Sequence, residues 1–300
     1  MKLFNKIIVA VVQLMPEAIV GVFSKRYIAG ETLEEAVNLV KSLNKKGIYA
    51  TIDVLGESVK NKVEAIEAKN KALEVLETIN KYNLLANLSI KPTQMGLSID
   101  ENFAFEQISE LTERAKEINN FIRIDMEDSN YTDSTLNLFI RLKKVFHNTG
   151  IVVQAYLKRT YDDVCSLNKI GTNYRLCKGI YIEHASIAYK GKQQIRDNYL
   201  HILETIIKNG NYVGIATHDE YLIKASKKMI TDLGVPKNKF EFQMLLGVRE
   251  DLRNKLNSEG YKVRVYVPFG SDWYAYSVRR LKENPQIAGY IFKSLFMINR

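Results

Sequence analysis

Strand-like and helix-like segments alternate along most of the chain, and this alternation restricts the fold more than any other feature. Tyr49–Gly56 and Val263–Val267 are the first and last of a series of short apolar runs that read as buried strands. A segment with apolar residues at helical spacing, such as Lys60–Tyr82, follows each run. The other expected strands are Leu85–Lys91, Phe121–Asp125, Ile151–Ala155, Asn173–Cys177, Val213–Ala216 and Phe240–Gln243. Eight strand–helix units in 300 residues predict an α/β fold of the (β/α)8 TIM-barrel type.

A doubly wound sheet would show the same alternation of strands and helices. However, no Gly-x-Gly-x-x-Gly turn follows any expected strand, so the sequence does not support a dinucleotide-binding Rossmann domain. We interpret residues 1–300 as a single barrel domain, with residues 1–45 as an N-terminal helical segment. The apolar run Ile7–Val12 in that segment is interrupted at Gln13 and Pro16. It is too short for a membrane span, which needs about 20 apolar residues.

The net charge of +9, from 43 basic and 34 acidic side chains, favours an anionic partner. A phosphate-bearing cofactor and an acidic membrane surface both fit. Nucleic acid fits less well, because the basic residues are spread along the chain and no arginine-rich arm is present. The two cysteines, Cys165 and Cys177, provide no zinc spacing, and we expect no metal site. They favour a reducing, cytoplasmic compartment.

Polar residues stand at the end of every expected strand. Parallel barrels build their active sites at these ends, so the side chains are expected to converge. They are Asp53, Lys91, Asp125, Gln154, Arg175 with Lys178, Thr217 with His218, Gln243 and Tyr266.

The segment Val265–Pro285 reads as a strand, a Pro/Gly turn and a final helix. Tyr276, Arg279, Arg280 and Glu283 are spaced i, i+3, i+4 and i+7, which places them on one helix face. Two adjacent guanidiniums suit a planar carboxylate, because each offers paired donors in a fixed geometry. The alternative is a solvated basic helix.

Several motifs, taken in order, resemble the proline dehydrogenase family from about residue 26 to the end. The C-terminal segment is the most specific of them. The others include Ala29–Glu34, Asp53–Glu57, Ser89–Gln94, Ile124–Glu127, Val153–Tyr156, Arg175–Gly179, Ala216–Asp219 and Phe240–Gln243. The chain is most similar to the monofunctional bacterial form, for which pyrroline-5-carboxylate dehydrogenase is a separate downstream protein.

The resemblance implies a (β/α)8 barrel that holds FAD non-covalently, with the last helix over the active site. It implies oxidation of L-proline to Δ1-pyrroline-5-carboxylate by hydride transfer to the flavin, the first step of proline catabolism. Electrons would pass to a membrane quinone, so a cytoplasmic protein that touches the inner face of the membrane peripherally is expected.

The resemblance also assigns roles to individual residues. Arg279 and Arg280 would bind the proline carboxylate, with Lys91 as a third cation and Glu283 holding the arginines. The apolar slot for the proline ring would be lined by Tyr181, Leu245, Tyr266 and Tyr276. The flavin would be contacted by Asp125, Gln154, Arg175, Lys178, Thr217, His218 and Gln243. Arg175 and Asp125 would take the catalytic roles.

Three alternatives remain from the sequence. Hydroxyproline dehydrogenase would use the same scaffold, but the resemblance implies that a tyrosine at the position of Tyr266 fills the space that a ring hydroxyl needs. A Schiff-base aldolase would use Lys91 or Lys178 as its nucleophile. A non-catalytic basic barrel would bind nucleic acid or membrane without a cofactor.

Overall fold

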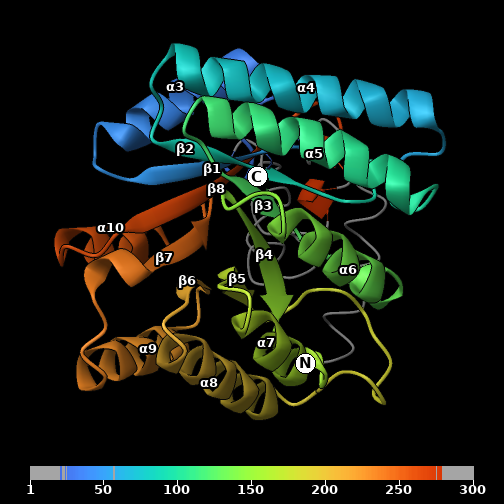
Figure 1. The fold of residues 1–300 in the computed structure, drawn as a ribbon. Helices are drawn as coiled ribbons and strands as arrows, with labels where there is room; N and C mark the ends of the chain where they lie inside the picture. Colours follow the sequence, from blue (N-terminus) through green and yellow to red (C-terminus); the bar gives the residue numbers. More distant parts are fainter. Residues whose placement is uncertain (1–20, 22–23, 25, 57, 275, 279–300) are drawn as a thin grey trace, which may run out of the picture.

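Eight parallel strands close into a barrel in the order in which they occur along the chain (Figure 1). The computed structural model describes residues 21, 24, 26–56, 58–274 and 276–278. The strands are β1 (Tyr49–Val54), β2 (Ala86–Ile90), β3 (Ile122–Ile124), β4 (Thr149–Gln154), β5 (Asn173–Cys177), β6 (Tyr212–Ala216), β7 (Phe240–Leu245) and β8 (Val263–Phe269). The barrel closes where β8 pairs with β1, from Tyr49 opposite Arg264 to Val54 opposite Phe269. This confirms the predicted (β/α)8 barrel.

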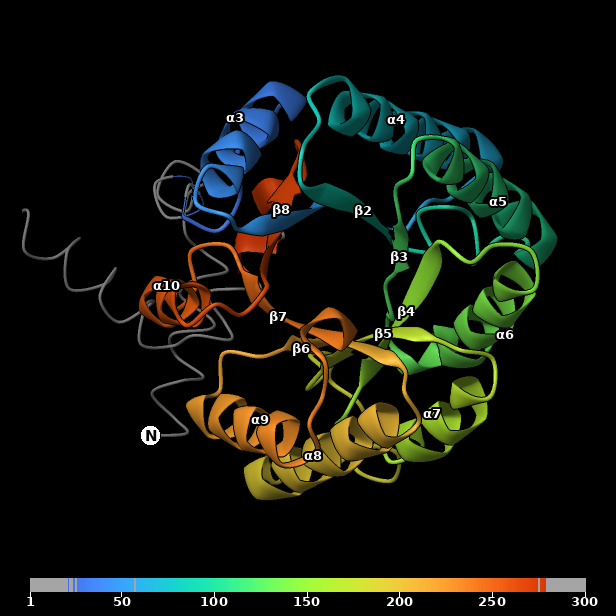
Figure 2. The same ribbon diagram turned by 60° about the vertical axis from the view of Figure 1, so that its left-hand side comes forward.

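The helices form an outer ring around the strands (Figure 2). They are α3 (Leu33–Asn44), α4 (Lys62–Lys81), α5 (Glu101–Glu117), α6 (Thr132–Lys143), α7 (Thr160–Asn168), α8 (Lys192–Lys208), α9 (Glu220–Asp232) and α10 (Glu250–Ser258), with short 3₁₀ helices at Ser129–Tyr131 and Lys237–Lys239. Polar caps fix several of the helix starts, because the first backbone N–H groups of a helix have no partner within it. Thr32 and Glu35 form a reciprocal capping box at α3, and Asp100 accepts from two backbone N–H groups at α5.

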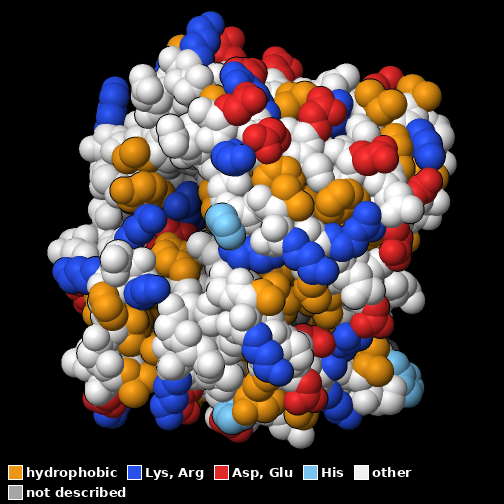
Figure 3. All heavy atoms as spheres, viewed as in Figure 1, with side chains coloured by type: hydrophobic (Ala, Val, Ile, Leu, Met, Phe, Trp, Pro, Cys, Tyr) orange, Lys and Arg blue, Asp and Glu red, His pale blue; other side chains and the backbone are white. Residues whose placement is uncertain are grey.

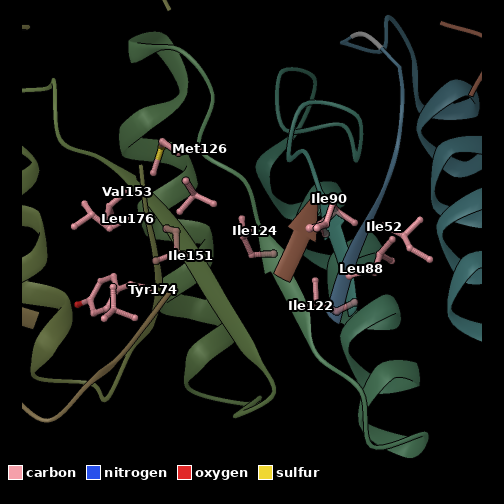
Figure 4. Close-up of a cluster of buried hydrophobic side chains, with 14 of the residues drawn as sticks. Ile52, Leu88, Ile90, Ile122, Ile124, Met126, Ile151, Val153, Tyr174 and Leu176 are labelled. Carbon is pink, nitrogen blue, oxygen red and sulfur yellow. The ribbon is translucent and has the colours of Figure 1, made fainter. Parts of the chain in front are cut away.

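Each barrel strand divides its side chains between an apolar outer face and a polar inner face, because successive residues point to opposite sides. The outer faces contribute Ile52, Leu88, Ile124, Val153 and their neighbours to one buried cluster under the helices (Figure 4). Outer-face Tyr174 reaches toward α7, where its hydroxyl donates to Asn168 Oδ1 at 2.9 Å. The helices are therefore held by the outer residues, and the inner residues are free to build a site.

Strand β8 runs past the expected end to Phe269 and contains Pro268. Proline has no N–H for a ladder hydrogen bond, so it belongs where one side of a strand is unpaired. The pairing of β8 with β7 ends at Tyr266, opposite Leu245, whereas β1 continues alongside Pro268. The carbonyl of Pro268 accepts from the Ala29 N–H at 2.9 Å, so the chain before α3 covers this end of the strand.

The segment before α3 packs against the start of the last helix. Tyr27 and Ile28 form a small apolar cluster with Leu55 and Tyr276. Helix α3 lies within the predicted N-terminal helical segment, whereas residues 1–20 lie outside the described part of the chain. None of the helices in the described ranges is long and apolar enough to cross a membrane.

Candidate active site

A cavity of about 1180 Å³ opens at the carboxyl ends of the barrel strands. Every predicted site residue that the structure describes lines this cavity. These residues are Lys91, Asp125, Gln154, Arg175, Lys178, Tyr181, Thr217, His218, Gln243, Leu245, Tyr266 and Tyr276. The remaining three, Arg279, Arg280 and Glu283, lie outside the described residues.

Arg175 forms the centre of the cavity floor. Its Nη1 donates to Asp125 Oδ1 at 2.8 Å, and its Nε donates to Gln243 Oε1 at 2.7 Å. Ser89 Oγ also accepts from Nη1, at 3.2 Å. These partners come from other strands of the barrel or from the residue that follows one, so the guanidinium is held in one orientation by groups that meet only in the folded state.

Both oxygens of the Asp125 carboxylate are engaged. Oδ1 accepts from Arg175 and from Ser89 Oγ, at 2.8 and 2.6 Å, and Oδ2 accepts from the Tyr266 hydroxyl at 3.0 Å. Burial, together with the nearby carboxylate of Asp125, raises the pKa of Tyr266 well above its ordinary value. Tyr266 therefore remains a phenol at neutral pH and donates a hydrogen bond to Asp125.

Lys91 and Asp53 form a second buried ion pair beside the first. Lys91 Nζ lies 2.7 and 2.8 Å from the two oxygens of Asp53, and the Asp53 side chain is only 1% exposed. Burial opposes the charge of Lys91, but the carboxylates of Asp53 and Asp125 outweigh it and raise the pKa of Lys91. Burial also raises the pKa of Asp53, and Lys91 opposes that shift. Lys91 thus lines the cavity as a cation, and the buried Asp53 carboxylate balances its charge.

Gln154 is fixed at the end of β4 by the loop after β3. Its Nε2 donates to the Glu127 carbonyl at 2.8 Å, which fixes the side chain where it lines the cavity. The Glu127 carboxylate accepts from the Thr93 backbone N–H at 2.9 Å and from the Thr93 hydroxyl at 2.6 Å. Burial raises the pKa of Glu127, and the bonds from Thr93 oppose this shift.

The outer wall of the cavity is basic. Lys178 lies 3.6 Å from Asp219 and is about two-fifths exposed, and Arg196 makes two hydrogen bonds to the same carboxylate at 2.7 and 2.9 Å. One carboxylate thus orients two cations at the mouth, which leaves an excess of positive charge there. Lysine and arginine in this arrangement suit a phosphate group.

Thr217 and His218 follow β6 on the same wall. His218 Nε2 accepts from the Leu245 backbone N–H at 2.9 Å, so the proton of the neutral ring is on Nδ1. The Thr217 hydroxyl accepts from the Asp219 N–H at 3.2 Å. The His218 bond connects the loop after β6 to β7 and places the ring of His218 beside Leu245, whereas the Thr217 bond is local to that loop.

The chain matches the family model described as proline dehydrogenase over residues 36–291. The chain belongs to the proline dehydrogenase family. It is 36% identical over 272 residues to "Proline dehydrogenase 1" of Bacillus subtilis strain 168, covering 91% of this chain and 90% of that relative. It is 37% identical over 277 residues to "Proline dehydrogenase" of Deinococcus radiodurans, covering 91% and 89%. The enzyme is therefore an oxidoreductase that acts on proline.

Solved structures of bifunctional family members share the same barrel. The crystal structure of proline utilization A (PutA) from Bdellovibrio bacteriovorus, inactivated by N-propargylglycine, superposes with a TM-score of 0.81 at 27% identity. The match covers 87% of this chain and 32% of that chain, so this chain spans about a third of the length of that PutA.

The predicted set of site residues for this proline dehydrogenase omitted several residues. Asp53 was recognised only as a polar strand end, although it is the partner of Lys91. Ser89, Glu241 and Arg264, which support the cavity residues through hydrogen bonds from below, were not assigned a role. Strand alternation is the signal that would have found them, since residues two apart on one strand share a face, as Glu241 and Gln243 do.

Proposed function

We propose that this proline dehydrogenase binds FAD in the barrel-mouth cavity and oxidises L-proline to Δ1-pyrroline-5-carboxylate, the first step of proline catabolism. The observation that carries this proposal is the buried Arg175–Asp125–Tyr266 cluster on the floor of one large cavity in a chain of this family. The cluster holds a fixed cation, a carboxylate and a phenol at the inner end of the cavity.

The residues of the cavity fit a dinucleotide flavin. A volume of about 1180 Å³ exceeds the roughly 300–1,000 Å³ of sites for one small molecule, so a large ligand and a small one fit together. The cations Lys178 and Arg196 at the outer wall suit the pyrophosphate, with Thr217 and His218 toward the adenosine half. Gln154, Arg175 and Gln243 line the part of the cavity where the ring system is proposed to lie.

The flavin, when bound, supplies the two-electron acceptor for the hydride that leaves the ring carbon next to the proline nitrogen. Arg175 supplies a fixed positive charge that stabilises negative charge developing nearby, at no cost of reorganisation. Lys91 and the arginines at 279 and 280 are proposed to grip the substrate carboxylate. Tyr181, Leu245, Tyr266 and Tyr276 are proposed to enclose the ring and exclude water.

The substrate amine must lose a proton before hydride can leave, because the nitrogen lone pair drives the transfer. The nearest carboxylates are occupied: Asp53 accepts from Lys91, and Asp125 accepts from Arg175, Ser89 and Tyr266. We propose that this proton passes to solvent when proline binds, with no side chain acting as a general base.

A membrane quinone is the proposed electron acceptor, with peripheral contact between this cytoplasmic enzyme and the inner face of the membrane. The net charge of +9 supports attraction to anionic lipid. Lys and Arg side chains are spread over the face shown in Figure 3 rather than gathered in one patch. A separate pyrroline-5-carboxylate dehydrogenase is proposed to consume the product. Failure of the protein to bind anionic vesicles at low salt would contradict the proposed membrane contact.

The proposal is tested by releasing the cofactor and comparing substrates. We expect one FAD per chain in the supernatant of acid-denatured protein, and faster turnover of L-proline than of hydroxyproline. N-propargylglycine, which inactivated the PutA of B. bacteriovorus, is expected to inactivate this enzyme as well. Purified protein that neither carries nor takes up FAD would contradict the proposal. Faster turnover of hydroxyproline than of L-proline would show that hydroxyproline is the substrate.

A further inference from the structure

A continuous chain of buried hydrogen bonds runs along the inside of the barrel from Arg264 to Arg175. Arg264 Nε donates to Glu241 Oε1 at 2.6 Å, and Gln243 Nε2 donates to the same oxygen at 2.7 Å. Gln243 Oε1 then accepts from Arg175 Nε at 2.7 Å. Glu241 lies one layer below the cavity and is 2% exposed, and it does not line the cavity.

Chemistry allows the Gln243 amide only one orientation in this chain. A carboxylate can only accept hydrogen bonds, so the amide NH₂ must face Glu241. A guanidinium can only donate, so the amide oxygen must face Arg175. Both neighbours therefore require the same orientation of the amide, with Arg175 fixing its oxygen and the Glu241 carboxylate fixing its NH₂.

The charge of Glu241 is secured by two cations. Arg264 contacts both of its oxygens, and Lys262 Nζ lies 3.2 Å from Oε2. Burial would raise the pKa of Glu241, but Arg264 and Lys262 outweigh it and lower that pKa to about 2. Glu241 is thus ionised throughout the neutral range.

Gly214 on β6 provides the space in which the amide lies. A Cβ built at this position would stand 2.3 Å from Gln243 Nε2 and 2.7 Å from its Cδ. Real Cβ atoms do not come so close to another heavy atom, so a side chain here would push the amide aside. The backbone of Gly214 pairs with Glu241 in the sheet, which brings the two positions together.

We propose that Glu241 is a positioning residue for Arg175: through Gln243 it holds the guanidinium in the orientation that stabilises the reduced cofactor. This inference rests on the proposed function in placing Arg175 beside the flavin. Glu241 would contact neither the flavin nor proline, and it acts on Arg175 only through the Gln243 amide. The relay also explains why a charged pair is retained in the interior of a barrel where apolar residues would pack.

Three variants test the relay. Glu241→Gln replaces the carboxylate with a neutral amide, so Gln243 loses the anion that anchors its NH₂ from below, and its bond to Arg175 is held less firmly. Gly214→Ala displaces the same amide by its methyl group and leaves every charge in place, so it remains informative if the first variant folds poorly. Lys262→Met is the matched control, because it removes a partner from the other oxygen of Glu241 and leaves the bond to Gln243.

Two readouts separate the relay from the proposed cofactor. The first is the Nε–H resonance of Arg175 in ¹⁵N-arginine-labelled protein prepared without flavin, assigned by its loss in Arg175→Lys. We expect this slowly exchanging signal to disappear in Glu241→Gln and Gly214→Ala and to persist in Lys262→Met. Persistence of the signal in both test variants would overturn the relay, whatever cofactor the enzyme uses.

The second readout is the midpoint potential of the bound flavin. We expect at least a tenfold loss of preference for the reduced state in both test variants, a fall of about 30 mV for a two-electron couple. Lys262→Met should stay within about threefold of the parent. A lost Arg175 signal with an unchanged potential would refute the role of the relay in stabilising the reduced cofactor. A protein without flavin would contradict the proposed function, and the arginine resonance would still decide the relay.

Discussion

Arg175 Nη1 lies 2.8 Å from Asp125 Oδ1, and this ion pair joins strand β5 to the residue that follows β3 across the inside of the barrel. Both side chains are largely buried, at 8% and 14% exposure. Tyr266 on β8 closes the arrangement through the second carboxylate oxygen. One cluster therefore couples three strands to the floor of the cavity, and stability and function depend on the same groups.

Asp125→Ala is expected to lower the free energy of unfolding by about 3–5 kcal/mol, because it leaves Arg175 as a buried cation without its anion. Tyr266→Phe removes only one hydrogen bond to the same carboxylate and should lower it by about 1.5–3 kcal/mol. Urea unfolding of both variants measures the difference. Equal losses would show that the ion pair does not govern the stability of the cluster.

Lys91→Met is expected to destabilise the enzyme by about 3–5 kcal/mol, since the buried Asp53 carboxyl would lose its cationic partner. The double variant Lys91→Met/Asp53→Asn removes both charges and should recover at least half of that loss. A double-mutant cycle on unfolding free energies measures the coupling. Strictly additive losses would mean that the two residues do not depend on each other.

Acid is expected to destabilise the barrel in part through Glu241. Its folded-state pKa of about 2 lies below the ordinary value of 4.5, so the unfolded chain takes up the proton first as the pH falls. The stabilisation is present above about pH 4.5 and is lost toward pH 2. Linkage gives a loss of about 2 kcal/mol between pH 5 and pH 3. Unfolding of Glu241→Gln over the same range should lack this component, and parallel pH profiles for parent and variant would contradict the assignment.

Arg279→Met and Arg280→Met are each expected to raise the proline concentration needed for half-maximal rate sharply, with flavin still bound. Loss of a desolvated, charged hydrogen-bond donor to the carboxylate costs about 2–5 kcal/mol. Steady-state kinetics with proline, together with the visible spectrum of each variant, separates substrate binding from cofactor loss. Normal use of proline by either variant would show that its arginine does not grip the carboxylate.

The barrel could be predicted from the sequence because each strand and each helix has a local sequence pattern of its own. Alternation of short apolar runs and helical spacing located β5 at Asn173–Cys177 without error, and most other boundaries within two or three residues. The remaining differences, of one or two residues at a strand end, come where tertiary pairing decides the length. Strand β3 is held to Ile122–Ile124 by its neighbours, and β8 extends over Pro268 because β1 continues beside it.

The members of the site could be predicted, but their pairing could not. The polar strand ends were expected at one rim, and the described ones line one cavity. The sequence does not show that Lys91 contacts Asp53, or that Arg175 contacts Asp125 rather than Asp53, because these choices depend on the register and tilt of the closed barrel. Glu241 was missed because it stands below the rim, where a charged residue normally argues against a core position.

The most direct test of the account is the visible spectrum of the purified enzyme, recorded without oxygen before and after addition of L-proline. We predict flavin absorption bands that bleach on addition of L-proline and return when an artificial acceptor is added. Flavin that stays oxidised with L-proline would contradict proline as the electron donor. A colourless protein that does not take up FAD would contradict the proposed cofactor and the role given to Arg175.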